Sequence, residues 1–142
     1  MDPKEILKTH KNWLTPTENE EINSKELIFY LNTTFKQKTE YTNDDRLVLN
    51  HDDQIDYRYQ VLNELGKGTF SNVYKCVDHK YDHSIAMKVI RHNLRYKNQS
   101  LIEKEIYDIF HASGKKNVNI LSLLKCFTYR DNLFIAYELF GI

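Results

Sequence analysis

The stretch LGKGTFSNVYKC, residues 65–76, holds two of the chain's four glycines, one residue apart. A P-loop has four residues between its glycines, followed by Lys and Ser or Thr, and this spacing is absent. A dinucleotide-binding turn needs a third glycine and a following helix, but Ser71 stands at the third position and residues 73–77 have strand character. The stretch therefore predicts a flap between two strands. It is either a plain hairpin turn or a loop whose backbone approaches phosphate oxygens.

The phosphate interpretation makes two further demands on the sequence. It predicts a valine soon after the loop and a lysine on the next strand, which Val73 and Lys88 satisfy. Strand alternation puts Ala86 and Lys88 on one face of that strand. A lysine in so apolar a strand is either paired or reaches water at the edge of the sheet. In the functional interpretation, Ala86 packs on an adenine ring and Lys88 reaches the phosphates.

A helix expected at residues 99–112 could supply the carboxylate that pairs with Lys88. Its apolar positions 102, 106, 109 and 110 follow helical spacing. Glu103 and Glu105 flank this stripe at similar offsets, so helical geometry alone does not choose between them. Either one could equally be a solvated surface charge.

The order of expected elements predicts an α+β fold. Alternating or apolar segments indicate five strands, at residues 57–65, 73–77, 84–91, 121–128 and 133–139. The helix lies between the third and the fourth strand. This order predicts a five-stranded antiparallel sheet with one packed helix.

Residues 1–56 are more polar and contain both prolines. Asp2 followed by Pro3 is typical of a capped helix start. A second helix is expected to start at Thr17, because Glu20 follows at the spacing of a capping box. The apolar segment 27–31 needs a surface to pack on, and residues 38–54 are expected to form an irregular connector. We therefore expect a partly helical N-terminal extension.

Composition limits the classes of function. The chain has 142 residues, 41% hydrophobic and 28% charged, which is typical of a globular protein. Its 20 acidic and 20 basic residues balance, so we expect neither nucleic acid nor an anionic membrane as a partner. There is no apolar signal core and no run long enough to span a bilayer, which predicts a cytoplasmic or nuclear protein. Cys76 and Cys126 are expected to be reduced, and no metal site is expected.

From Tyr57 onward the chain resembles the N-terminal lobe of a eukaryotic protein kinase. LGKGTFSNVYKC resembles the Gly-rich loop, IAMK the V-A-I-K strand, and QSLIEKEIYDIF the helix with the paired glutamate. The sequence of these motifs is most similar to that of the DYRK family, the dual-specificity tyrosine-regulated kinases. LTPTENEEINSKELIFYLN resembles that family's DYRK-homology box, a segment that packs on the N-lobe. The resemblance divides the chain into this extension, residues 1–56, and a kinase N-lobe, residues 57–142.

The resemblance also implies a set of site residues. Glu103, not Glu105, takes the position of the glutamate paired with Lys88, and these two would form the catalytic ion pair. Tyr137 falls at the gatekeeper position, where the family usually has Phe. The implied ATP-binding residues are Leu65, Gly66, Lys67, Gly68, Thr69, Phe70, Ser71, Val73, Ala86, Lys88, Tyr137, Glu138 and Phe140.

The printed sequence contains neither an H-R-D-x-x-x-x-N loop nor a D-F-G motif, and it ends at Gly141-Ile142. The catalytic base and the Mg²⁺ ligands of a kinase belong to these motifs. We therefore expect this polypeptide alone to bind ATP weakly or not at all and to have no kinase turnover. Mg²⁺ and the family's Ser/Thr substrates are implied only once a C-terminal lobe is supplied.

Three interpretations of the chain remain open. It could be the N-lobe of a DYRK-type kinase whose remainder lies elsewhere, with ATP and a protein substrate as partners. It could be a non-catalytic module that binds a protein through the DYRK-box region and the exposed face of the sheet. It could be a decaying kinase fragment. The retained Lys88 and Glu103 favour the first interpretation.

Overall fold

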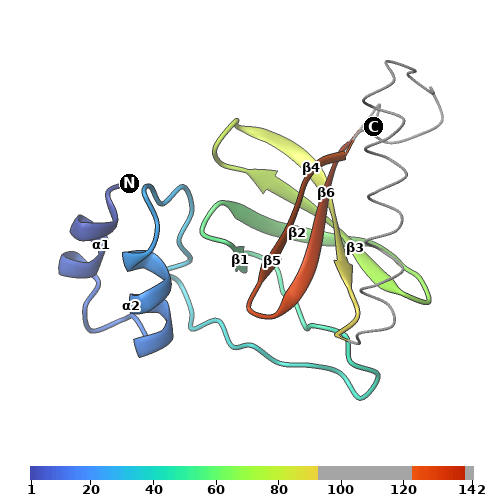
Figure 1. Cartoon of the computed structure of the whole chain (residues 1–142), viewed down its shortest axis with the longest axis horizontal. Coiled ribbons are helices and arrows are strands. Elements are labelled where there is room, and N and C mark those ends of the chain that lie inside the picture. The colour runs from blue at the N-terminus through green and yellow to red at the C-terminus, as the bar shows by residue number, and fades with distance from the viewer. Residues whose placement is uncertain (93–122, 140–142) are drawn as a thin grey trace.

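Six strands form one antiparallel sheet within residues 1–92 and 123–139, which the computed structural model describes. In chain order they are β1 (Gln54–Ile55), β2 (Tyr59–Lys67), β3 (Ser71–Asp78), β4 (His83–Ile90), β5 (Leu123–Tyr129) and β6 (Asn132–Glu138). Their order across the sheet is β1-β2-β3-β4-β6-β5. Two helices, α1 (Pro3–Thr9) and α2 (Pro16–Asn23), lie to one side of the sheet (Figure 1). The predicted α+β fold is confirmed.

The sheet has two distinct faces, set by the alternation of side chains along each strand. The core face carries Met87, Val89 and Phe134, which are buried in the main hydrophobic cluster. The opposite face, here called the Lys88 face, carries Val73, Ala86, Lys88, Ile135 and Tyr137 by the register of β3, β4 and β6.

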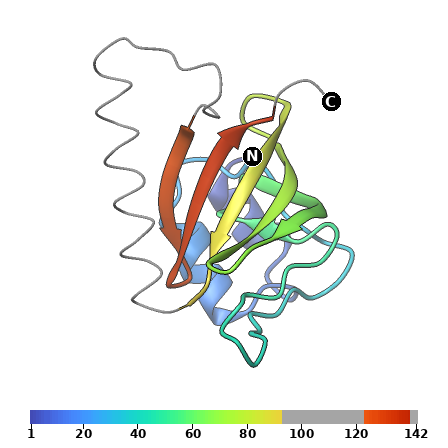
Figure 2. The same cartoon turned by 90° about the vertical axis from the view of Figure 1, so that its right-hand side faces the viewer.

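The N-terminal extension packs on the core face. Ile6, Leu14, Ile22 and Ile28 are buried in the same cluster as Met87. The blue helices accordingly lie behind the strands in Figure 2. The apolar segment 27–31 therefore has the surface that it was expected to need.

Segment 27–31 is fixed to the lobe through Tyr57. Ile28 is fully buried, and the amides of Phe29 and Tyr30 both donate to the Tyr57 carbonyl, at 2.9 and 3.0 Å. Tyr57 has a left-handed backbone with φ of 55°, which is unusual for a bulky residue. These hydrogen bonds help to hold that conformation.

The first helix starts as predicted, but the start predicted for the second is wrong by two residues. The Asp2 carboxylate accepts from the Lys4 amide and caps α1, with Pro3 in its first turn. Helix α2 is capped by Thr15, not Thr17: Thr15 and Glu18 form a reciprocal capping box. Thr15–Glu18 and Thr17–Glu20 both have the spacing of a capping box. Only Thr15 precedes Pro16, whose fixed φ and missing N–H suit the first helical position, so Thr15 is the cap.

The prediction of five strands missed β1, which lies in the expected connector. Its two residues pair with β2, with Gln54 opposite Gln60 and Ile55 opposite Tyr59. A two-residue strand is too short to show alternation, so no period marks it in the sequence. Because β1 precedes residue 57 and joins the sheet, the division into 1–56 and 57–142 stays a prediction. The expected helix 99–112 lies outside the described residues.

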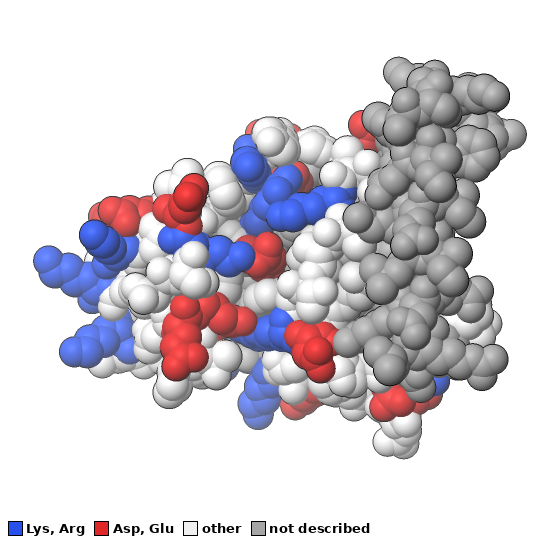
Figure 3. All heavy atoms as spheres, viewed as in Figure 1, with Lys and Arg blue, Asp and Glu red and all other residues white. Residues whose placement is uncertain are grey.

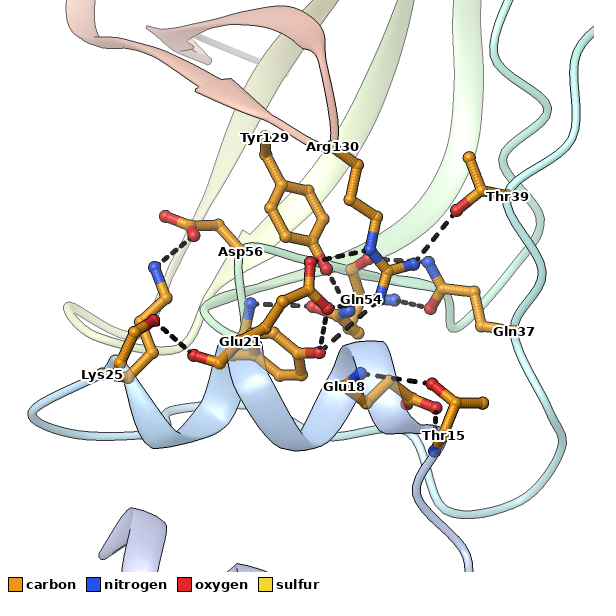
Figure 4. A network of polar contacts seen from close by, with 12 residues as sticks. Thr15, Glu18, Glu21, Lys25, Gln37, Thr39, Gln54, Asp56, Tyr129 and Arg130 are labelled. Atoms are coloured by element: carbon orange, nitrogen blue, oxygen red, sulfur yellow. Dashed lines mark hydrogen bonds and ion pairs between the residues drawn. The ribbon is translucent and has the colours of Figure 1, made fainter.

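A polar network joins α2 to the turn between β5 and β6 (Figure 4). The Arg130 guanidinium donates to both carboxylate oxygens of Glu21, at 2.8 and 3.0 Å. The Tyr57 hydroxyl donates to the same carboxylate at 2.6 Å, and Gln54 donates to the Tyr129 hydroxyl at 2.7 Å. Burial raises the pKa values of both tyrosines, so both hydroxyls stay protonated at neutral pH; the Tyr57 hydroxyl donates and the Tyr129 hydroxyl accepts. The network ties the extension to the sheet through buried polar groups that form hydrogen bonds with one another.

Candidate functional site

The glycine loop, residues 65–71, connects β2 to β3. Gly66 and Lys67 end β2, Ser71 begins β3, and Lys67 pairs with Asn72 across the hairpin. The Gly68 amide donates to the Ser71 carbonyl at 2.8 Å and closes the turn. Leu65 and Phe70 are 45% and 37% exposed, so the tip carries apolar side chains in the open.

Nothing in the described fold requires glycine at either loop position. A Cβ added to Gly66 would meet no atom within 4 Å, and one added to Gly68 would meet only the Ser71 carbonyl oxygen, at 3.8 Å. Neither glycine has a left-handed φ. The glycines therefore leave open space beside the backbone, which fits a loop that lets another molecule approach its amides.

The strand register brings the predicted pocket residues to one face. Val73 lies opposite Lys88 on the β3 side of β4, and Ile135 lies opposite Lys88 on the β6 side. One step along, Ala86 lies opposite Tyr137. Residues directly opposite in antiparallel strands point to the same face, so these side chains share the Lys88 face. Ala86 is buried and Lys88 is half-buried.

Some predicted site residues cannot be placed. Glu103 and Phe140 lie outside the described residues, so the Lys88–Glu103 pair stays a prediction. Glu138 ends β6 and lies opposite Ile85, on the other face from Tyr137. The prediction for Glu138 is that its backbone groups bind adenine, and this does not depend on the direction of its side chain.

Sequence reasoning missed Arg46, which lies in the expected connector and contacts the glycine loop. Its side chain is buried, with the residue only 7% exposed. It donates to the carbonyls of Gly68 and Ser71, at 2.7 and 3.1 Å, and to the Asn72 side chain at 2.7 Å. No periodicity marks an arginine in an irregular segment, so only the fold reveals it.

Asp44 orients this arginine. Its carboxylate accepts from Arg46 Nε at 2.7 Å and from the Thr42 hydroxyl at 2.6 Å. These hydrogen bonds hold the pKa of the Asp44 carboxyl well below its ordinary value; the bond from Thr42 has the larger effect and the bond from Arg46 the next largest. The carboxylate is therefore ionised at neutral pH and keeps the guanidinium aimed at the loop.

The described part of the chain holds no group of three or more His, Cys, Asp or Glu side chains that could bind a metal ion. Cys76 and Cys126 are not joined in a disulfide, and burial raises the pKa of the Cys76 thiol to about 12. Neither α1 nor α2 is long and apolar enough to cross a membrane. On the surface shown in Figure 3, acidic and basic side chains are interspersed.

Comparison with known proteins agrees with this geometry. Residues 59–141 match the family model of the protein kinase domain, and the chain belongs to that family. The resemblance to DYRK kinases extends beyond the domain, over the extension as well. The chain is 35% identical over 150 residues to dual specificity tyrosine-phosphorylation-regulated kinase 4 of Homo sapiens, covering 97% of this chain.

Two further relatives give the same result. A putative dual specificity tyrosine-phosphorylation-regulated kinase 3 homolog of Drosophila melanogaster is 30% identical and the kinase 3 of Rattus norvegicus 29%, each over the whole chain. The chain spans 29%, 18% and 26% of the lengths of these three relatives, in the order given. The expected resemblance to a DYRK-type N-lobe is confirmed.

Proposed function

We propose that this chain is the ATP-binding N-lobe of a DYRK-type protein kinase. When completed by a C-terminal lobe, it would transfer the terminal phosphoryl group of ATP to serine or threonine of a protein substrate. The observation that carries the proposal is the register of β3 and β4, which puts Val73 and Lys88 opposite each other on one face. The open space beside Gly66 and Gly68 supports it independently.

Each residue of the site has a proposed role. Amides of the glycine loop would face phosphate oxygens, and Lys88, paired with Glu103, would supply positive charge to them. Leu65, Val73 and Ala86 would pack on adenine. Tyr137 would stand at the back of the pocket, and the backbone of Glu138 and Phe140 would bind the adenine edge.

We further propose that these 142 residues alone bind ATP weakly and have no turnover. Phosphoryl transfer depends on positioning, a base and metal-assisted charge neutralisation. Lys88 and Glu103 provide neither the base nor a metal ligand. Mg²⁺ would be held by residues of the C-terminal lobe.

Binding is tested by titrating the chain with a fluorescent ATP analogue. Lys88→Met should weaken binding about tenfold, because it removes a charged donor to phosphate. Lys125→Met is the matched control: Lys125 is also half-buried on the sheet, but its ammonium lies over the Phe127 ring, which packs on the core-face cluster. Equal affinity of wild type and Lys88→Met would contradict the proposed role of Lys88.

Turnover is tested separately, with labelled ATP and a generic basic protein substrate. We expect no transfer by the purified chain in the presence of Mg²⁺. Transfer that disappears in Lys88→Met would contradict the proposal that the chain alone is inactive. Transfer that persists in Lys88→Met would indicate a contaminating kinase, and the assay would be repeated after further purification.

A further inference from the structure

The N-terminal extension holds the glycine loop through one buried arginine. Arg46 donates to the carbonyls of Gly68, Thr69 and Ser71, at 2.7, 3.3 and 3.1 Å. It also donates to the Asn72 side chain, which in turn donates to Glu64 across the hairpin at 2.8 Å. One side chain from outside the kinase domain match thus contacts the turn of the loop and the start of β3, and is linked to β2 through Asn72.

The geometry of the peptide unit gives this contact a directional consequence. In a trans peptide, the C=O and the following N–H point in opposite directions. Carbonyls of Gly68 and Thr69 that point at Arg46 therefore turn the amides of Thr69 and Phe70 away from it. Amide groups held in fixed directions are the feature by which such a loop binds phosphate oxygens.

The segment that carries Arg46 is itself held in place. Residues 41–47, here called the anchor segment, form a small hairpin in which Tyr41 pairs with Leu47. The Thr42 amide donates to the Arg46 carbonyl at 2.8 Å, and Asp45 adopts φ of 62°, which aspartate tolerates better than most residues. Arg46 thus projects from a closed turn and not from a loose connector.

A second arginine, Arg91, links the anchor segment, the glycine loop and the end of β4. Arg91, just after β4, donates from Nε to the Asp44 carbonyl at 2.8 Å and from Nη1 to the Thr69 carbonyl at 3.1 Å. Its amide donates to the Phe70 carbonyl at 2.9 Å. The anchor segment, the glycine loop and the end of β4 therefore form one hydrogen-bonded junction.

We propose that Arg46 is a positioning residue for nucleotide: it presets the glycine loop to receive phosphate and so couples docking of the anchor segment to ATP affinity. This inference rests on the proposed function. A preset loop loses less conformational freedom on binding than a free one, which favours binding. Because coupling is reciprocal, ATP should also tighten the docking of the anchor segment.

The test compares Arg46→Met with Arg58→Met in the full 142-residue chain. Met keeps the apolar stem and removes every donor in both variants. Arg58 is a matched control, because it is also largely buried and ion-paired, but with Asp78, at the opposite end of the β2–β3 hairpin from the loop. A third variant, Arg46→Lys, keeps the charge but not the planar fork that reaches several carbonyls.

Two quantities are measured below the melting temperature of every variant. The first is hydrogen exchange of the Gly68 amide, which the hydrogen bond to Ser71 protects. The second is the dissociation constant for the fluorescent ATP analogue. Arg46→Met should speed Gly68 exchange and weaken binding about tenfold, within the usual range of coupling between sites. Arg46→Lys should fall between, and Arg58→Met should change neither.

The outcomes separate this inference from the proposed function. Binding by wild type with an unchanged dissociation constant in Arg46→Met would overturn the positioning role and leave the ATP site standing. Equal weakening by Arg46→Met and Arg58→Met would also overturn it, because the effect would then follow general stability. Absence of binding in wild type at millimolar analogue would overturn the proposal that this chain alone binds ATP and, with it, a positioning role of Arg46 toward nucleotide in this chain.

Discussion

Asp78 shows at the scale of one residue how a buried charge is made acceptable. Its carboxylate is 1% exposed and accepts two hydrogen bonds from Arg58, at 2.9 and 2.8 Å, and one from the Lys80 amide at 3.0 Å. Burial alone would raise the pKa of this carboxyl, but the hydrogen bonds from Arg58 and Lys80 outweigh burial and hold the pKa below its ordinary value. The ionised pair closes the end of the hairpin opposite the glycine loop.

A lowered pKa makes a prediction for acid stability. The contribution of Asp78 to folding is present above the pKa of the unfolded carboxyl, about 3.9, and is lost as pH falls through the lower pKa of the folded state. Urea unfolding at a series of pH values should therefore show a steeper acid loss for wild type than for Asp78→Asn. Parallel pH profiles for the two proteins would contradict this.

Single residues also show where sequence reasoning ends. Ala86 and Lys88 could be assigned to one face from spacing alone, because strand alternation is local. That Val73 shares this face follows only from the register of β3 and β4. Arg46 could not be placed from spacing, because its partners are carbonyls of residues 68, 69 and 71, more than twenty positions away in a segment without period. The fold leaves open space beside Gly66 and Gly68, and their role toward phosphate stays a prediction.

At the scale of the element, the start of α2 is decided by one proline. Thr15 and Thr17 both have glutamate three residues later, and only Thr15 precedes Pro16. The local pattern was read correctly for α1 because only one cap candidate exists there. Strand β1 was missed because two residues carry no pattern of their own and depend on β2 for pairing.

The capping box predicts different effects for two chemically identical substitutions. Thr15→Ala should lower the free energy of unfolding by about 1 kcal/mol, because it removes an N-cap side chain. Thr17→Ala should leave stability nearly unchanged or raise it slightly, because Thr17 is an exposed helical residue and Ala is the better helix former. Thermal unfolding of both variants decides; a larger loss for Thr17→Ala would contradict the observed cap.

At the scale of the whole molecule, the two faces of the sheet have separate tasks. The extension covers the core face through apolar burial and the Glu21–Arg130 network. The Lys88 face carries the residues proposed for ATP. The anchor segment is the point at which the extension also reaches the glycine loop, so the two halves of the chain meet at the proposed site.

The fold class and the family were accessible from the sequence because several motifs agree over residues 57–140. How the extension packs was not, since it depends on contacts between residues far apart in the chain. Glu21 and Arg130 are 109 positions apart, and no local pattern links them. Long-range polar pairs of this kind are where sequence reasoning fails on physical grounds.

The most direct test of the central claim is to map ATP onto the chain by amide chemical shifts. The isotope-labelled chain would be titrated with ATP and Mg²⁺ up to millimolar concentration, which suits weak binding. We predict that the shifts concentrate at residues 65–73 and along the Lys88 face, at Ala86, Lys88 and Tyr137, and weaken in Lys88→Met. Shifts confined to the extension, or no shifts up to millimolar ATP, would contradict the claim that this chain alone binds nucleotide.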